Sequence, residues 1–201
     1  MDLNYPNKFF IFLLIFSTLL TLISCDSEKK EFQGTIFQNE HKAFDVNLKN
    51  QYGELINLND INKIKIVTFL YSNCTDICPS ITFKLKEIHK NLENINDKYK
   101  IIVISVDPEN DTEESILKYS KEYKMEDKWF YLRGDKENLS IIWEKYYISN
   151  WIEQNEVKNN ISLNHSAPIY IIDENQNMKL LYTEPIKIDE IINDINLLIS
   201  N

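Results

Sequence analysis

The stretch "FLYSNCTDICPSITFKLKEI", residues 69–88, places Cys74 and Cys78 between two segments with different hydrophobic patterns. The overlapping run "KIKIVTFLY", residues 63–71, is rich in β-branched and aromatic residues, which is typical of a buried central strand. After the cysteines, apolar residues recur at helical spacing, at Ile81, Leu85, Ile88 and Leu92. We therefore expect the two cysteines on a turn that joins a buried strand to a helix.

The rest of the chain alternates between strand and helix patterns. Strand patterns occupy residues 100–106, 128–135 and 168–184, the last with a turn at 175–177. Helical patterns occupy residues 116–123, 139–146 and 188–200. An alternating segment around Gln51, Tyr52 and Gly53, within residues 43–60, predicts an N-terminal β-hairpin. These patterns predict an α/β thioredoxin-like fold, with an irregular inserted loop at 148–164 before the turn that bears His165.

Composition restricts both the number of domains and the class of function. A chain of 201 residues with 43% hydrophobic residues is long enough for one domain with a sizeable core. The formal charge of −9 and the single arginine, Arg133, exclude a nucleic-acid-binding surface. Three isolated glycines leave no phosphate-binding loop of the Rossmann or P-loop kind.

The N-terminal segment predicts export. Residues 1–24 contain an apolar run after Lys8, as in a secretory signal peptide. This run ends in Leu-Ile-Ser immediately before Cys25, which resembles a bacterial lipobox. Cys25 is then expected to carry lipid; the alternative is an uncleaved membrane anchor. Residues 25–42 are polar and are predicted to be a tether, with the folded domain at residues 43–201. Both alternatives place the domain at the cell membrane, on the extracytoplasmic side.

In that oxidising compartment, Cys74 and Cys78 are expected to form a disulfide unless something else binds them. A spacing of four residues is about one helical turn and allows a Cα separation of roughly 6 Å, within disulfide range. Backbone N–H groups at a helix start lower the pKa of a nearby thiol. The pair can therefore act as a redox couple or, when reduced, bind a soft metal.

A metal site needs a third ligand, and the chain has three histidines. His89 lies within the predicted helix 79–94, His41 lies in the predicted tether, and His165 immediately precedes a strand. In a thioredoxin-like fold, the turn before that strand lies against the cysteine turn, which favours His165, although a single loop histidine is often only solvated. Two thiolates and one imidazole suit copper, as Cu(I) or Cu(II). A structural zinc site would usually need a fourth protein ligand.

Three motifs together resemble the Sco/SenC family of copper-binding cytochrome c oxidase assembly factors. They are "YSNCTDICP" (71–79), "ISVDPENDT" (104–112) and "NHSAPIYIID" (164–173), and the similarity extends over about residues 40–200. The resemblance implies a membrane-tethered, thioredoxin-like domain that faces outward. It also implies three copper ligands: Cys74, Cys78 and His165.

The chain departs from the family pattern at three positions, none of them a ligand: Leu70 replaces a glycine, Thr75 a proline and Asn164 an acid. Asp107 is the remaining acid that we expect near the metal site; its alternative role is to cap the following helix. Asp111 and Glu114 resemble a pair that starts this helix.

The leading hypothesis is a copper chaperone rather than a true enzyme. It would deliver copper to the binuclear site of cytochrome c oxidase subunit II, reduce the cysteines of that subunit, or do both; another copper enzyme could be the client. The alternative is an extracytoplasmic thiol–disulfide oxidoreductase with incidental metal binding. A peroxiredoxin-like peroxidase is a third hypothesis, but Tyr71 occupies positions where that chemistry needs Thr, Ser or Pro.

Overall fold

The computed structural model describes residues 31–148 and 167–200, and the folded unit comprises Phe32–Asn201. Six strands form one mixed sheet: β1 (Thr35–Lys42), β4 (Ile64–Leu70), β5 (Tyr99–Ser105), β6 (Trp129–Leu132), β7 (Ile169–Ile172) and β8 (Asn177–Tyr182). The predicted hairpin is present as β2 (Asn47–Lys49) and β3 (Leu55–Asn57). The expected α/β architecture is therefore confirmed.

The sheet has the order β1-β8-β7-β4-β5-β6. Strand β4 pairs parallel to β5 and antiparallel to β7, while β5 pairs parallel to β6. All seven residues of β4 are buried, which explains why its sequence is nearly continuous in hydrophobicity. Because β7 runs opposite to β4, β7 begins at the end of the sheet where β4 ends.

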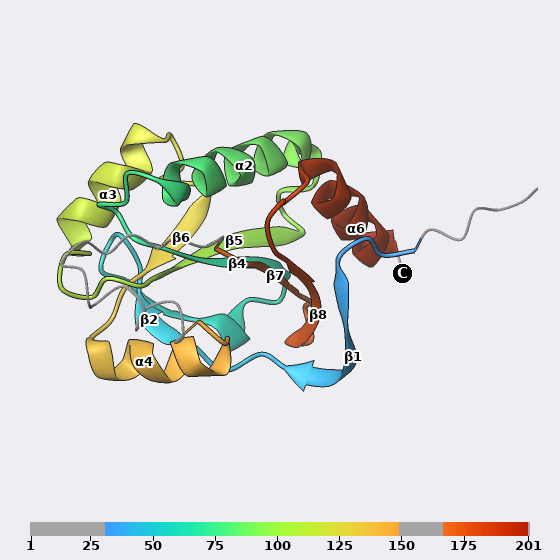
Figure 1. Ribbon diagram of the computed structural model, residues 1–201, viewed down its shortest axis with the longest axis horizontal. Coiled ribbons are helices and arrows are strands. Elements are labelled where there is room, and N and C mark those ends of the chain that lie inside the picture. Colours follow the sequence, from blue (N-terminus) through green and yellow to red (C-terminus); the bar gives the residue numbers. More distant parts are fainter. Residues whose placement is uncertain (1–30, 149–166, 201) are drawn as a thin grey trace, which may run out of the picture. The chain divides into compact units, whose positions relative to one another are not determined.

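Helices cover both faces of the sheet (Figure 1). One face carries α2 (Ile77–Asn91), α3 (Glu113–Glu122) and α6 (Ile188–Ser200), and the other carries α4 (Lys136–Lys145) with the β2–β3 hairpin. Thr82 of α2 and Tyr119 of α3 share a buried hydrogen bond of 2.8 Å between their hydroxyls. Two short 3-10 helices lie in connections: η1 (Leu58–Asp60) and η2 (Glu93–Ile95).

The start of the folded domain differs from the sequence prediction. Residues 35–42, assigned to the polar tether, form β1, which pairs antiparallel with β8. The fully buried Asp194 accepts hydrogen bonds from the backbone N–H groups of Gln33 (2.8 Å) and Gly34 (2.9 Å). The prediction that the tether extends to residue 42 was wrong, because an edge strand gains its stability from backbone pairing and can keep polar side chains.

The segments assigned to the signal peptide and most of the inserted loop lie outside the described residues. Within residues 31–148 and 167–200, no helix has the length and apolar character needed to cross a bilayer.

A lysine lies inside the sheet. Lys65 in β4 is fully buried, and its Nζ donates hydrogen bonds to the backbone carbonyls of Lys63 (3.0 Å) and Asp173 (3.3 Å). Burial disfavours the ammonium form and lowers the pKa of Lys65 to about 8, although the charges of Asp173 and Glu174 oppose this shift.

We predict a pH-dependent stability difference between the Lys65→Met variant and the parent. Between pH 8 and 10.5 the unfolded lysine keeps its proton while the folded one releases it, so the parent gains stability as pH rises. The free energy of unfolding of Lys65→Met, relative to that of the parent, should therefore fall by on the order of 2 kcal/mol from pH 7 to pH 10. Urea unfolding of both proteins at the two pH values measures this change; an unchanged difference would contradict it.

Candidate metal and thiol site

The two cysteines lie where β4 passes into α2. Cys78 is in the first turn of α2 and is 0% exposed, while Cys74 precedes the helix and is 6% exposed. The backbone N–H of Cys78 donates a hydrogen bond of 3.3 Å to the Cys74 sulfur. Both thiols are free, so the structure presents the dithiol form of the pair. The expected strand-to-helix turn is confirmed, and it brings the two residues into contact.

The pKa values of the two thiols are shifted in opposite directions. A hydrogen bond from the Cys78 thiol lowers the pKa of Cys74 to about 5, against the effect of burial, and the backbone N–H groups of Asp76 and Cys78 and the Tyr71 hydroxyl act in the same direction. Burial raises the pKa of Cys78 far above its ordinary value, and the adjacent Cys74 charge raises it further. Cys74 is therefore the thiolate of the pair, and Cys78 holds the proton.

The acids of the second motif lie close to this turn, and neither of them caps α3. Asp107 is buried and its carboxylate accepts hydrogen bonds from the side-chain amide of Asn110 (3.0 and 2.9 Å). It does not cap α3, because the hydroxyl of Thr112 does so by accepting from the N–H of Ser115 (3.1 Å). Burial chiefly raises the pKa of Tyr71, followed by the hydrogen bond and charge of Cys74 and the charge of Cys78, and Asp107 makes the smallest contribution.

Asp111 also differs from its prediction. Its carboxylate does not start α3 but turns inward and accepts hydrogen bonds from Ser72 in the cysteine turn. A sequence signal for this exists: Thr112, directly after Asp111, is itself a favoured helix cap three residues before Ser115.

Two of the three candidate histidines lie away from the cysteines. His89 follows Cys78 by 11 residues along α2, roughly 16 Å of helix. Its Nδ1 shares a hydrogen bond of 2.7 Å with the Tyr99 hydroxyl. His41 lies in the edge strand β1, three strands from β4. His165 lies outside the described residues. In the part of the chain that is described, no group of three His, Cys, Asp or Glu residues could hold a metal ion.

The segment that follows His165 returns to the structure beside β4. Ala167 is buried, and the backbone carbonyl of Pro168 accepts a hydrogen bond of 2.9 Å from the hydroxyl of Thr68. Val67 of β4 pairs with Tyr170 of β7 in the antiparallel register. The chain therefore enters β7 at the end of the sheet where the cysteine turn begins.

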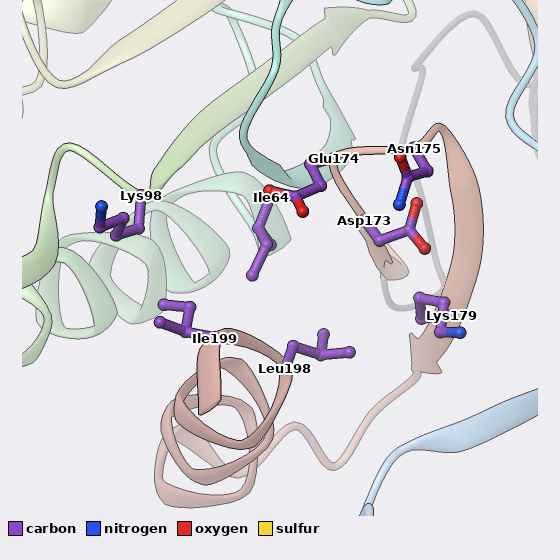
Figure 2. Close-up of a pocket in the computed structure, with 8 residues that line it drawn as sticks. All are labelled: Ile64, Lys98, Asp173, Glu174, Asn175, Lys179, Leu198 and Ile199. Atoms are coloured by element: carbon purple, nitrogen blue, oxygen red, sulfur yellow. The ribbon is translucent and has the colours of Figure 1, made fainter. Parts of the chain in front are cut away.

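A separate pocket of about 470 Å³ lies at the opposite end of β4 (Figure 2). Ile64, the first residue of β4, lines it together with side chains of both charges, among them Glu174 and Lys179. The length of β4, seven residues and roughly 20 Å from Ile64 to Leu70, lies between this pocket and the cysteine turn. None of the predicted site residues lines this pocket.

Comparison with known proteins identifies the family. The SCO1/SenC family model matches residues 36–200. The chain belongs to the SCO1/SenC family. A SCO2-like protein of Rickettsia typhi is 28% identical over 173 residues, which cover 81% of this chain and 82% of that protein.

Solved Sco structures share the fold. BsSco, a member of the Sco family of cytochrome c oxidase assembly proteins in which a disulfide switch was identified, matches with a TM-score of 0.68 and 24% identity, over 86% of this chain and 99% of that one. Copper-bound ScoI of Arabidopsis thaliana matches with a TM-score of 0.66 and 23% identity, over 80% and 99% of the two chains.

A more distant match supports the fold class. The thioredoxin domain of a thiol–disulfide oxidoreductase from Bacteroides vulgatus has a TM-score of 0.59 and 18% identity, over 80% of this chain and 97% of that one. The fold of this SCO1/SenC protein is thus thioredoxin-like, as its sequence pattern predicted.

The acidity of the two thiols makes a kinetic prediction. Because the pKa of Cys74 is about 5, its alkylation by iodoacetamide should reach a plateau above about pH 6 and fall about tenfold per unit well below pH 5. Peptide mapping of the reduced, metal-free protein between pH 4 and 9 measures this rate. In the Cys74→Ser control, the buried Cys78 should react slowly throughout. A Cys74 rate that still rises tenfold per unit between pH 6 and 8 would contradict the assignment.

Proposed function

We propose that this SCO1/SenC protein is a membrane-tethered copper chaperone and thiol reductant that assembles the binuclear copper site of cytochrome c oxidase. The observation on which the proposal mainly rests is the contact between Cys74 and Cys78 in the dithiol form. Two adjacent sulfurs, one a thiolate, are soft donors that favour Cu(I). Copper is the cargo in this role, and the client is oxidase subunit II or another copper enzyme.

We propose His165 as the third copper ligand. Support comes from the described residues on either side of the site: β7 begins beside the end of β4, and only Ser166 separates His165 from Ala167 in the sequence. His89 and His41 are placed elsewhere by α2 and β1. A neutral imidazole would add the nitrogen donor that makes Cu(II) acceptable at a thiolate site. Asp107 would act near this site through its charge.

The same cysteines can transfer electrons. The Cys74 thiolate attacks a disulfide of the client and forms a mixed disulfide, and Cys78 then displaces the client thiol. Two electrons pass to the client with the one proton that Cys78 held, the second client thiolate takes its proton from solvent, and Cys74 and Cys78 end as an intramolecular disulfide. This step prepares a client dithiol for copper. The alternative function, a thiol–disulfide oxidoreductase, would use the same two cysteines but would not require metal binding.

We further propose that Cys25 is lipidated and anchors the domain on the extracytoplasmic side of the membrane. The support is the lipobox-like sequence and the polar segment that follows it. Since β1 begins at Thr35, the tether would be shorter than the sequence alone suggested.

The copper ligands can be tested by titration of the reduced soluble domain. We expect one Cu(I) per chain, abolished by Cys74→Ser or Cys78→Ser, because each thiolate supplies charge and soft donor character. His165→Ala should weaken Cu(I) binding less and should lose the sulfur-to-Cu(II) charge-transfer absorption. His89→Ala and His41→Ala are matched controls and should keep the parent spectrum. A His165→Ala variant with that spectrum would remove His165 from the site and favour the oxidoreductase.

Anchoring has its own test in the full-length chain expressed in a bacterial host. Cys25→Ser should block lipid attachment and cleavage, so the variant should persist as a precursor with residues 1–24 attached. Intact mass and detergent partitioning of the parent and variant distinguish the two forms. Normal maturation of Cys25→Ser would refute the lipobox assignment.

A further inference from the structure

The buried carboxylate of Asp111 links the cysteine turn to the strands of the sheet. Its side chain is 1% exposed, and its two oxygens accept from four donors. One oxygen accepts from the N–H (2.8 Å) and the hydroxyl (2.6 Å) of Ser72. The other accepts from the hydroxyls of Ser105 (2.5 Å) and Tyr131 (3.4 Å). The carboxylate thus joins the turn after β4 to β5 and β6.

Asp111 is itself fixed on its backbone side. Its N–H donates to the carbonyl of Asp107 (2.9 Å), and its carbonyl accepts from Nε of Arg133 (3.0 Å). Because Thr112 caps α3, the carboxylate of Asp111 is not needed at the helix start. A buried carboxylate with all its partners in place resists movement, since any displacement leaves buried donors unpaired.

Ser72 is next to the residue that contacts both sulfurs. The hydrogen bond from the Tyr71 hydroxyl helps to lower the pKa of Cys74, and the backbone N–H of Tyr71 opposes the rise in the pKa of Cys78. The carbonyl of Tyr71 accepts a hydrogen bond of 3.3 Å from the N–H of Cys74. The bonds from Ser72 to Asp111 therefore fix the backbone directly after Tyr71.

We infer that Asp111 is a positioning residue that acts through Ser72 and Tyr71 to hold the cysteine pair in its dithiol geometry. The inference deepens the proposed function and rests on it in taking Cys74 and Cys78 as the working pair. The hydrogen bonds held by this arrangement, among them the 3.3 Å bond from the N–H of Cys78 to the Cys74 sulfur, stabilise the reduced sulfur, and a disulfide sulfur accepts hydrogen bonds more weakly. Loss of the arrangement should therefore favour the disulfide over the dithiol.

The test is the equilibrium of the metal-free protein with glutathione at pH 7, in which the dithiol and one oxidised glutathione give the protein disulfide and two reduced glutathiones. Asp111→Ala should raise the equilibrium constant for oxidation about tenfold, equivalent to about 30 mV toward a more reducing potential. Asp111→Asn should stay within about threefold of the parent or shift toward the dithiol, because the amide oxygen still accepts from Ser72 and its NH₂ can donate to a serine hydroxyl.

Asp194→Ala is the matched control for lost stability. Asp194 is as buried as Asp111 and accepts from Gln33, Gly34 and Tyr182 (2.6 Å), which lie at the β1–β8 edge of the sheet. Both alanine variants should lower the urea midpoint, but only Asp111→Ala should change the glutathione equilibrium. An equal change in Asp194→Ala, or in Asp111→Asn, would overturn the inference, because stability or charge would then account for it.

Ser72→Ala provides a milder test if Asp111→Ala does not fold. It removes only the 2.6 Å hydroxyl bond and keeps the backbone bond, so a change of about threefold in the same direction is expected. An unchanged equilibrium in Ser72→Ala would overturn the inference. The measurement needs no copper. If the glutathione equilibrium shifts as expected but the protein binds no Cu(I), the inference is supported and the copper function is refuted. If the protein binds Cu(I) normally but the equilibrium does not shift, the copper function is supported and the inference is refuted.

Discussion

The pairing of β4 between β5 and β7 is the constraint on which the cysteine site depends. A strand buried along its whole length has one register and one direction, because a shift of one residue would move every side chain to the other face. Its end point is therefore fixed in space. The six residues between β4 and α2 begin from that fixed point, and the adjoining entry to β7 is fixed by the same ladder.

The environment of the two sulfurs makes one cysteine a thiolate and keeps the other protonated, a difference that the sequence does not show. Complete burial keeps Cys78 protonated, while Cys74 sits where a thiol, a hydroxyl and backbone N–H groups can all donate to it. Such a pair can bind a soft metal through both sulfurs or begin thiol exchange through one. The buried acids Asp107 and Asp111 lie in the connection between β5 and α3, and Asp111 bonds to the cysteine turn. The contacts that hold this connection in place therefore also bring negative charge near the cysteines.

Much of the architecture could be predicted from hydrophobic pattern. The strands near Ile66 and Ile102 have the nearly continuous hydrophobicity of buried strands, and the helix that contains Pro79 has apolar residues at a spacing that matches its buried face. The alternating pattern around Gly53 predicted the hairpin. Strand β1 could not be found in this way, because an edge strand with polar side chains has no buried face to create a pattern. The features that define β1 are its backbone pairing with β8 and the hydrogen bonds from Gln33 and Gly34 to Asp194. Asp194 lies about 160 positions further along the chain.

The sequence by itself determined the cysteine turn, the family motifs and the fold class, since these depend on residues close together along the chain. Only the tertiary structure decided that Cys74 rather than Cys78 is the thiolate, that His89 and His41 lie away from the pair, and that Asp111 serves the cysteine turn instead of α3. The physical reason is common to all three. Acidity, ligand geometry and hydrogen bonding depend on burial and on partners from distant segments, and those are set when β4, β5 and α2 pack together.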